Sequence, residues 1–145
     1  MEAPVPTYWR MKIKYIFYLE VVISVFAIFQ AAFWPQAFLE TSLGMRGEAV
    51  AGELARWYSV LLFFLMYIYM VSMHQRRWYF FRHVLIALLL GDVLHLTTTI
   101  VAATNLGTWS PGLFGSLGVT LLFAGSRMVA LRKPSLIGRT YDFED

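Results

Sequence analysis

An aspartate and a histidine occur within a long apolar run of the chain. The stretch LLLGDVLHLTTT, residues 88–99, places Asp92 and His95 three positions apart, with Thr99 about one turn further on. On a helix this spacing puts the side chains on one face. Because ionisable groups inside an apolar span are costly, they are functional candidates by default. Asp92 and His95 are therefore the first candidates for chemistry.

A second group of polar residues borders other apolar runs. Glu53 and Arg56 are also three positions apart, Trp57 and Tyr58 follow them directly, and Gln30 lies within the first run. A carboxylate suits the first turn of a helix, so Glu53 and Arg56 are also readable as a solvated ion pair. A role in chemistry and a solvated ion pair both remain open for Glu53 and Arg56.

Glu20 and Arg127 form a third candidate group at matching depths in the first and last apolar runs. A structural ion pair is the simplest explanation, since pairing is how buried charges normally persist in a membrane. The functional alternative is that Glu20, with Ser24 one turn above it, lines the floor of a cavity and contacts substrate.

The composition identifies the solvent that surrounds these residues. Hydrophobic residues make up 59% of the 145 residues and charged residues 14%, against about 25% charged in soluble domains. A single small core cannot hide this apolar excess, because a small domain has much surface for its volume. The solvent around the remaining apolar residues is therefore expected to be lipid. The chain has no cysteine, which excludes a thiolate nucleophile and a cysteine-ligated metal.

Four segments are long enough to cross a bilayer, which takes about 20 mostly apolar residues. They are helices, since an open strand cannot satisfy its backbone in lipid. The sequence therefore predicts an all-α integral membrane four-helix bundle with residues 1–145 as one transmembrane domain. The predicted spans are residues 15–33, 54–73, 82–103 and 113–131.

Basic residues indicate the orientation of the bundle. They gather before the first span, around the second connection and after the fourth span, so both termini are expected in the cytoplasm. Because they are scattered over three segments, the net charge of +3 predicts topology and no nucleic-acid partner. The residues are Arg10, Lys12 and Lys14, then Arg76, Arg77 and Arg82, and then Arg132, Lys133 and Arg139.

Depth along the helices predicts a single site. At about 1.5 Å per residue, Asp92 lies roughly 15 Å from the cytoplasmic start of its span, and His95 lies slightly nearer the lumen. Gln30 has a depth similar to that of His95. We expect five polar side chains from three helices to converge in the lumenal half, beside Trp57 and Tyr58. They are Gln30, Glu53, Arg56, Asp92 and His95.

Such a site favours acid and base catalysis without a metal or another cofactor. A carboxyl group in an apolar pocket can stay protonated and act as an acid or base near neutral pH. We expect Asp92 to be the general base, oriented by His95 or Arg56, and Glu53 or His95 to be the acid. Opening of an epoxide fits these groups, and so does isomerisation or cyclisation of an alkene. The expected partners are membrane lipid and a lipophilic small molecule that enters from it.

The four short spans, the motif ELARWY at residues 53–58 and the motif DVLHL at residues 92–96 resemble small fungal membrane proteins of secondary-metabolite clusters. These are the aurovertin- and citreoviridin-type epoxide hydrolases and cyclases. The resemblance implies epoxide opening on a polyketide-type molecule, carried by Glu53, Arg56, Asp92 and His95. We expect the membrane that the four spans cross to be that of the endoplasmic reticulum. Span number and size are similar to those of the sterol-isomerase and sigma-2-receptor superfamily.

Other functions fit the same residues. The polar groups can tie helices together by hydrogen bonds in a protein that binds lipid or sterol without catalysis. A sterol-type isomerase is a second alternative. A proton-coupled transporter is a third, for which a homodimer would supply eight helices.

Overall fold

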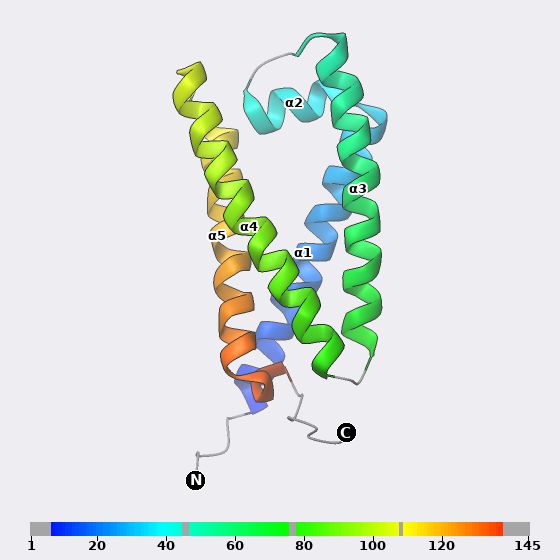
Figure 1. The fold of residues 1–145 in the computed structure, drawn as a ribbon, viewed down its shortest axis with the longest axis vertical. Coiled ribbons are helices and arrows are strands. Elements are labelled where there is room, and N and C mark those ends of the chain that lie inside the picture. Colours follow the sequence, from blue (N-terminus) through cyan, green and yellow to red (C-terminus); the bar gives the residue numbers. More distant parts are fainter. Residues whose placement is uncertain (1–6, 45–46, 76–77, 108, 138–145) are drawn as a thin grey trace.

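The computed structural model describes residues 7–44, 47–75, 78–107 and 109–137, without the side chains of residues 7–14, 43 and 106. These residues form five α-helices and one short 3-10 helix, and the described ranges contain no strand (Figure 1). The elements are α1 (Thr7–Phe33), α2 (Pro35–Leu43), α3 (Ala49–His74), α4 (Trp78–Leu106), α5 (Pro111–Arg132) and the 3-10 helix Pro134–Ile137.

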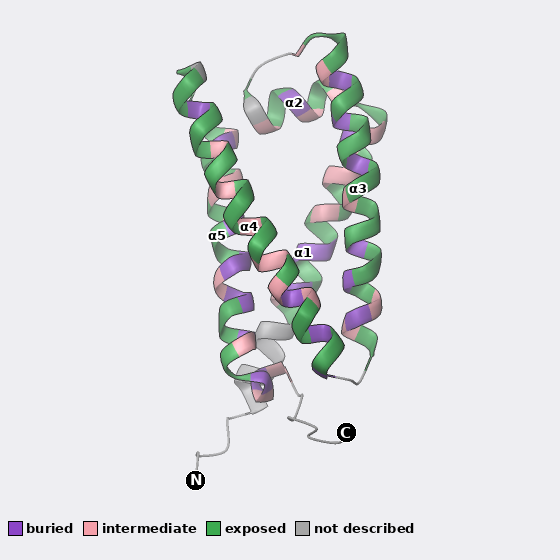
Figure 2. Ribbon diagram, viewed as in Figure 1, coloured by how far each residue is buried: buried purple, intermediate pink, exposed green. Residues whose placement is uncertain are grey.

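Four of the helices are long and apolar enough to cross a membrane, which confirms the predicted all-α integral membrane bundle. The spanning segments are Tyr15–Phe33, Ala49–His74, Trp78–Asn105 and Pro111–Arg132. Their outward faces are exposed and rich in large apolar side chains (Figure 2). A helix that is apolar on its outer side suits lipid as its solvent.

The short helix α2 was not predicted, because its residues lie between the first two predicted spans. Pro35 stands at the first position of α2, where its missing N–H leaves no hydrogen bond unmade. Gly44 ends the helix with φ of 73°, a left-handed conformation that glycine adopts without strain. A turn at Trp34 and Pro35 therefore starts a second helix that lies across one end of the bundle (Figure 1).

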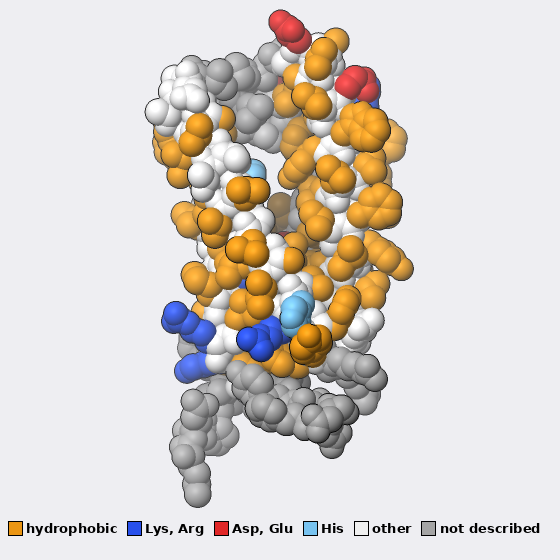
Figure 3. All heavy atoms as spheres, viewed as in Figure 1, with side chains coloured by type: hydrophobic (Ala, Val, Ile, Leu, Met, Phe, Trp, Pro, Cys, Tyr) orange, Lys and Arg blue, Asp and Glu red, His pale blue; other side chains and the backbone are white. Residues whose placement is uncertain are grey.

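The spanning helices form two pairs, α1 with α3 and α4 with α5. The pairs approach each other at the end where α1 begins and α5 ends, and they diverge toward α2 (Figure 1). We call these the closed end and the α2 end. At the α2 end, α2 contacts α1, α3 and α5. The space-filling view shows a hollow between α3 and α4 in the half of the bundle nearer α2 (Figure 3).

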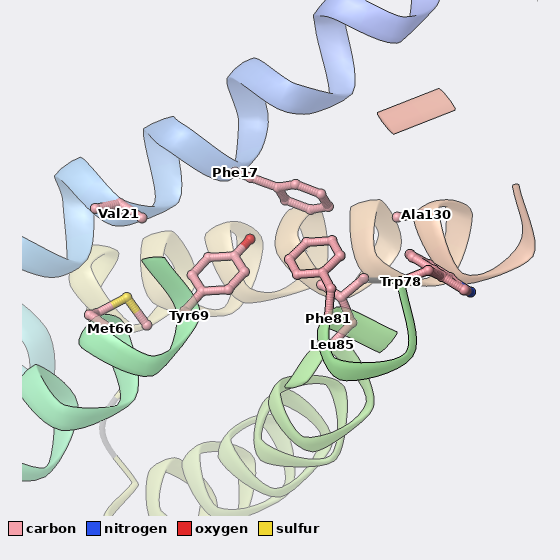
Figure 4. Close-up of a cluster of buried hydrophobic side chains, with 8 residues drawn as sticks. All are labelled: Phe17, Val21, Met66, Tyr69, Trp78, Phe81, Leu85 and Ala130. Carbon is pink, nitrogen blue, oxygen red and sulfur yellow. The ribbon is translucent and has the colours of Figure 1, made fainter. Parts of the chain in front are cut away.

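A cluster of buried side chains joins the two pairs near the closed end (Figure 4). The ring centroids of Phe17 and Tyr69 are 6.1 Å apart in an edge-on arrangement, and those of Tyr69 and Phe81 are 6.4 Å apart and stacked. Such aromatic pairs stabilise by about 0.5–1.5 kcal/mol each beyond the area they bury. The cluster consists of Phe17, Val21, Met66, Tyr69, Trp78, Phe81, Leu85 and Ala130.

Lysine and arginine side chains gather at the closed end (Figure 3). Arg82 follows the start of α4, and Arg132 and Lys133 mark the end of α5. The positive-inside rule infers orientation from such an uneven distribution of basic residues. The side of the membrane that each end faces stays a prediction. The other basic side chains on which that prediction depends lie outside the described residues. They are Arg10, Lys12, Lys14, Arg76, Arg77 and Arg139.

Two adjacent phenylalanines on α4 test the aromatic cluster. Phe81 is 2% exposed, whereas Phe80 is 39% exposed on the outer side. We expect Phe81→Ala to lower the free energy of unfolding by about 2 kcal/mol, because removal of the ring leaves a cavity. The loss of apolar burial adds little to this value, since lipid is as apolar as the protein interior. Phe80→Ala should change it by less than a third of that. Titration with SDS in mixed micelles, followed by circular dichroism, measures both, and equal losses would contradict the described core.

Candidate functional site

The centre of the site is Arg127 on α5, which bridges two carboxylates from different helices. Its Nη2 donates to Glu20 Oε1 on α1, and its Nη1 donates to Asp92 Oδ2 on α4. The side chains of Arg127 and Glu20 are 2% and 4% exposed, whereas that of Asp92 is 15% exposed. The expected ion pair between Glu20 and Arg127 is present, and Asp92 is joined to it. We call these three residues the charged triad.

The charged triad lies where the helix pairs begin to diverge. Glu20 follows Phe17 by about one turn of α1, and Arg127 precedes Ala130 by about one turn of α5. Phe17 and Ala130 both belong to the aromatic cluster. Val21, which follows Glu20 directly, belongs to the cluster as well. The triad therefore adjoins the cluster, and Phe17 and Ala130 lie between it and the closed end.

Three buried polar atoms around the triad make no hydrogen bond with another described residue. They are Glu20 Oε2, Arg127 Nε and the hydroxyl of Tyr69. Figure 4 shows the Tyr69 hydroxyl directed toward α1, where it interacts with the Glu20 carboxylate. Glu20, Arg127 and Tyr69 thus form one polar contact between α1, α5 and α3.

Asp92, His95 and Thr99 share one face of α4, as the spacing predicted. His95 is exposed, and its Nε2 lies 3.2 Å from Ser116 Oγ on α5. Asp92 and His95 interact electrostatically along the helix, and Thr99 is half-buried. The structure thus holds an accessible carboxylate and an accessible imidazole one turn apart, each tied to α5 by a different partner.

Glu53 and Arg56 occupy a different place, at the α2 end. They form an ion pair within the first turns of α3, with Arg56 49% and Glu53 61% exposed. Trp57 is 70% exposed, and Tyr58 stacks on Phe38 of α2 with ring centroids 5.9 Å apart. Within the described part of the chain, no hydrogen bond or ion pair links this group to the charged triad. The cation beside Asp92 is Arg127 and not the expected Arg56.

Gln30 is also separate from the charged triad. It lines an open recess of about 240 Å³ at the corner between α1 and α2. The recess is lined by Phe26, Phe29, Trp34 and Ala37 as well, and the three aromatic residues are largely exposed. Depth placed Gln30 near His95, but its direction around α1 places it in this outer recess.

Arg127 and Ser116 are the residues that the predicted site lacked. The depth match between Glu20 and Arg127 was visible in the sequence, but Asp92 was assigned to the other half of the bundle. The long side chain of Arg127 contacts both Glu20 and Asp92, although the two carboxylates were predicted at different depths. The site can place an acid and a base on one helix face, and the described residues contain no group of histidine, aspartate and glutamate side chains that could hold a metal ion.

Comparison of the chain with protein families, with curated proteins and with solved structures gives no match. The case for a function therefore depends on the geometry of this site.

Removal of the central cation tests the charged triad. We expect Arg127→Met to lower the free energy of unfolding by about 3–5 kcal/mol, because it leaves the buried Glu20 and the partly buried Asp92 without a cation. Neutralising all three residues, with Glu20→Gln and Asp92→Asn added, should recover most of the loss. The control is Arg56→Met, for which we expect less than about 1 kcal/mol because that pair is exposed. SDS titration in mixed micelles measures each variant, and a loss in Arg127→Met no greater than the control would contradict the triad.

Proposed function

We propose that this protein is a membrane-embedded acid and base enzyme that opens an epoxide of a lipophilic polyketide- or terpene-type molecule, by hydrolysis or by cyclisation. The observation that carries the proposal is the partial exposure of Asp92. Its partners in the charged triad are almost fully buried, whereas Asp92 is 15% exposed. It also lies one turn from the exposed imidazole of His95. A purely structural triad gains nothing from leaving one carboxylate accessible.

Asp92 is the general base in this mechanism, and Arg127 holds it in place. One carboxylate oxygen accepts from Arg127 Nη1, which leaves the other free to accept a proton from water or from a substrate hydroxyl. Oxygen of that nucleophile then forms a bond to an epoxide carbon while the carbon–oxygen bond of the ring breaks. Positioned bases of this kind contribute roughly 10²–10⁴-fold to a rate.

His95 is the general acid. It is accessible, it lies one turn from Asp92 on the same face, and its Nε2 is oriented by Ser116. A protonated imidazole donates to the epoxide oxygen as the ring opens, so one proton leaves the nucleophile and one arrives at the leaving oxygen. Transfer of a proton from Asp92 to His95 through water restores both groups. The exposed Glu53 is less suited to this role, because it pairs with Arg56 at the α2 end.

The surroundings of the site support a substrate that arrives from the bilayer. The hollow opens sideways between α3 and α4 (Figure 3), and the faces of these helices are rich in leucine, phenylalanine and tyrosine. The resemblance of the motifs at residues 53–58 and 92–96 to the aurovertin- and citreoviridin-type proteins supports the same chemistry. We propose the endoplasmic reticulum as the location, with both termini in the cytoplasm.

A non-enzymatic lipid- or sterol-binding protein is the second candidate, and the charged triad itself favours it. Arg127 ties α5 to both α1 and α4, so the polar groups contribute to helix association whether or not they catalyse. A sterol-type isomerase would use the same acid and base on an alkene. The three candidates differ in product: unchanged ligand, rearranged alkene, or opened epoxide.

Substitution of the two proposed catalytic groups tests the mechanism. We expect Asp92→Asn and His95→Gln each to lower turnover of a lipophilic epoxide in microsomes by about 10²-fold or more. The control on the same helix is Thr97→Ala, whose hydroxyl bonds only to the backbone of Val93 among the described residues. That variant should retain turnover. Full activity in folded Asp92→Asn protein would refute the catalytic assignment.

Analysis of bound and released molecules separates enzyme from binder. The protein purified in detergent should convert added alkyl or polyene epoxides to a diol or a cyclic ether, detected by mass spectrometry. Recovery of every added epoxide unchanged, together with one ligand that co-purifies in stoichiometric amount, would favour the binding protein instead.

A further inference from the structure

Helix α2 joins the two helix pairs at the end where they diverge. Its first residues pack against α3, where a Cβ added at Gly52 would lie 3.3 Å from the Gln36 side chain and 3.8 Å from Pro35. Its buried residue Leu39 is 7% exposed. Its last residues contact the start of α5. Nine residues thus cross from one pair to the other above the hollow (Figure 1).

The contact between α2 and α5 is a contact of backbone with backbone. A Cβ added at Gly112 would overlap the carbonyl oxygen of Thr41. A second close approach lies beside it, where a Cβ at Gly44 would stand 2.5 Å from Cβ of Ser110. Ser110 also caps α5, since its Oγ accepts from the N–H of Leu113. Any side chain at position 112 must therefore push α2 and α5 apart, because neither backbone can turn aside.

We propose that α2 is a strut that sets the width of the hollow, and that Gly112 is the specificity-determining residue at its contact with α5. The cluster and the charged triad fix the separation of the helix pairs at the floor, and α2 fixes it at the α2 end. The hollow between these two connections has a set width, which limits the breadth of a molecule that reaches Asp92.

The consequence for substrate choice rests on the proposed function. A hollow of set width discriminates between a slender chain and a broad ring system, and we expect the native hollow to favour a linear molecule with its epoxide on an extended chain. A wider hollow should admit broader epoxides. The strut itself does not depend on catalysis, since helix separation can be measured without any substrate.

Spin labels across the hollow measure its width directly. The chain has no cysteine, so Leu54→Cys on α3 and Val101→Cys on α4, which are 63% and 52% exposed, provide two unique sites. A normal contact of carbon with oxygen is about 3.3 Å or more. Gly112→Ala should therefore shift the spin–spin distance in lipid nanodiscs by more than about 1 Å. The control is Gly115→Ala on the same helix, whose Cβ would meet nothing within 4 Å.

The distances decide whether the strut exists. A shift in Gly112→Ala and none in Gly115→Ala supports it, and an unchanged distance in folded Gly112→Ala overturns it. If Gly112→Ala does not fold, Leu39→Ala loosens α2 instead and should broaden the distance distribution. An unchanged distribution in Leu39→Ala would then overturn the proposal.

Turnover of a linear and a bulky cyclic epoxide decides the specificity role. The ratio of their kcat/KM values should change in favour of the cyclic epoxide by at least about threefold in Gly112→Ala and stay constant in Gly115→Ala. A shifted distance with a constant ratio would remove Gly112 from specificity. If the native protein turns over neither epoxide, the proposed function fails, and the spin–spin distance alone decides the strut.

Discussion

The contact of one guanidinium with two carboxylates organises the rest of this bundle. Lipid offers no hydrogen bonds to a charge, so Glu20, Asp92 and Arg127 must meet inside the protein. Their meeting brings α1 and α4 to α5 at one depth, and it fixes the rotation of α4, a helix whose predominantly apolar surface would tolerate many rotations. The face of α4 that carries Asp92 then also carries His95. The charged triad thus determines which groups reach the hollow as well as how the helices associate.

The same interaction gives the site its chemical character. Two carboxyl groups and one guanidinium leave one unbalanced negative charge when all are ionised, and an unbalanced charge in apolar surroundings is costly. Uptake of one proton removes the imbalance, and release of that proton restores it. Exchange of one proton is also the step on which the proposed acid and base catalysis depends. In the proposed mechanism Glu20 matters although it is buried, because it contributes to the charge that Asp92 shares with Arg127.

The sequence predicted the parts of the fold that depend on hydropathy. It missed those that depend on the direction in which a side chain points around its helix. The existence of the spans followed from the length and apolar composition of four segments. The pair of Glu20 with Arg127 followed from the equal depth of these residues in their spans. Depth alone also grouped Gln30 with His95, but their helices direct these two side chains to different places. Helix α2 was missed because Trp34 and Pro35 look like the end of a span, whereas a proline at the first helical position also begins a helix. Direction around an apolar helix is fixed by tertiary contacts.

The arrangement of the connections explains why a hollow survives between helices that would gain contacts by closing. Side chains and lipid are equally apolar, so no hydrophobic force draws α3 and α4 together. The aromatic cluster and the charged triad hold the pairs at one end. At the other end α2 holds them through the backbone contact at Gly112 and the contact of Gly44 with the Ser110 side chain. Closing the hollow would require α2 to leave α5 or the guanidinium to leave a carboxylate, and the second change leaves a charge without its partner. An open lateral space beside an accessible carboxylate is therefore a stable property of this fold.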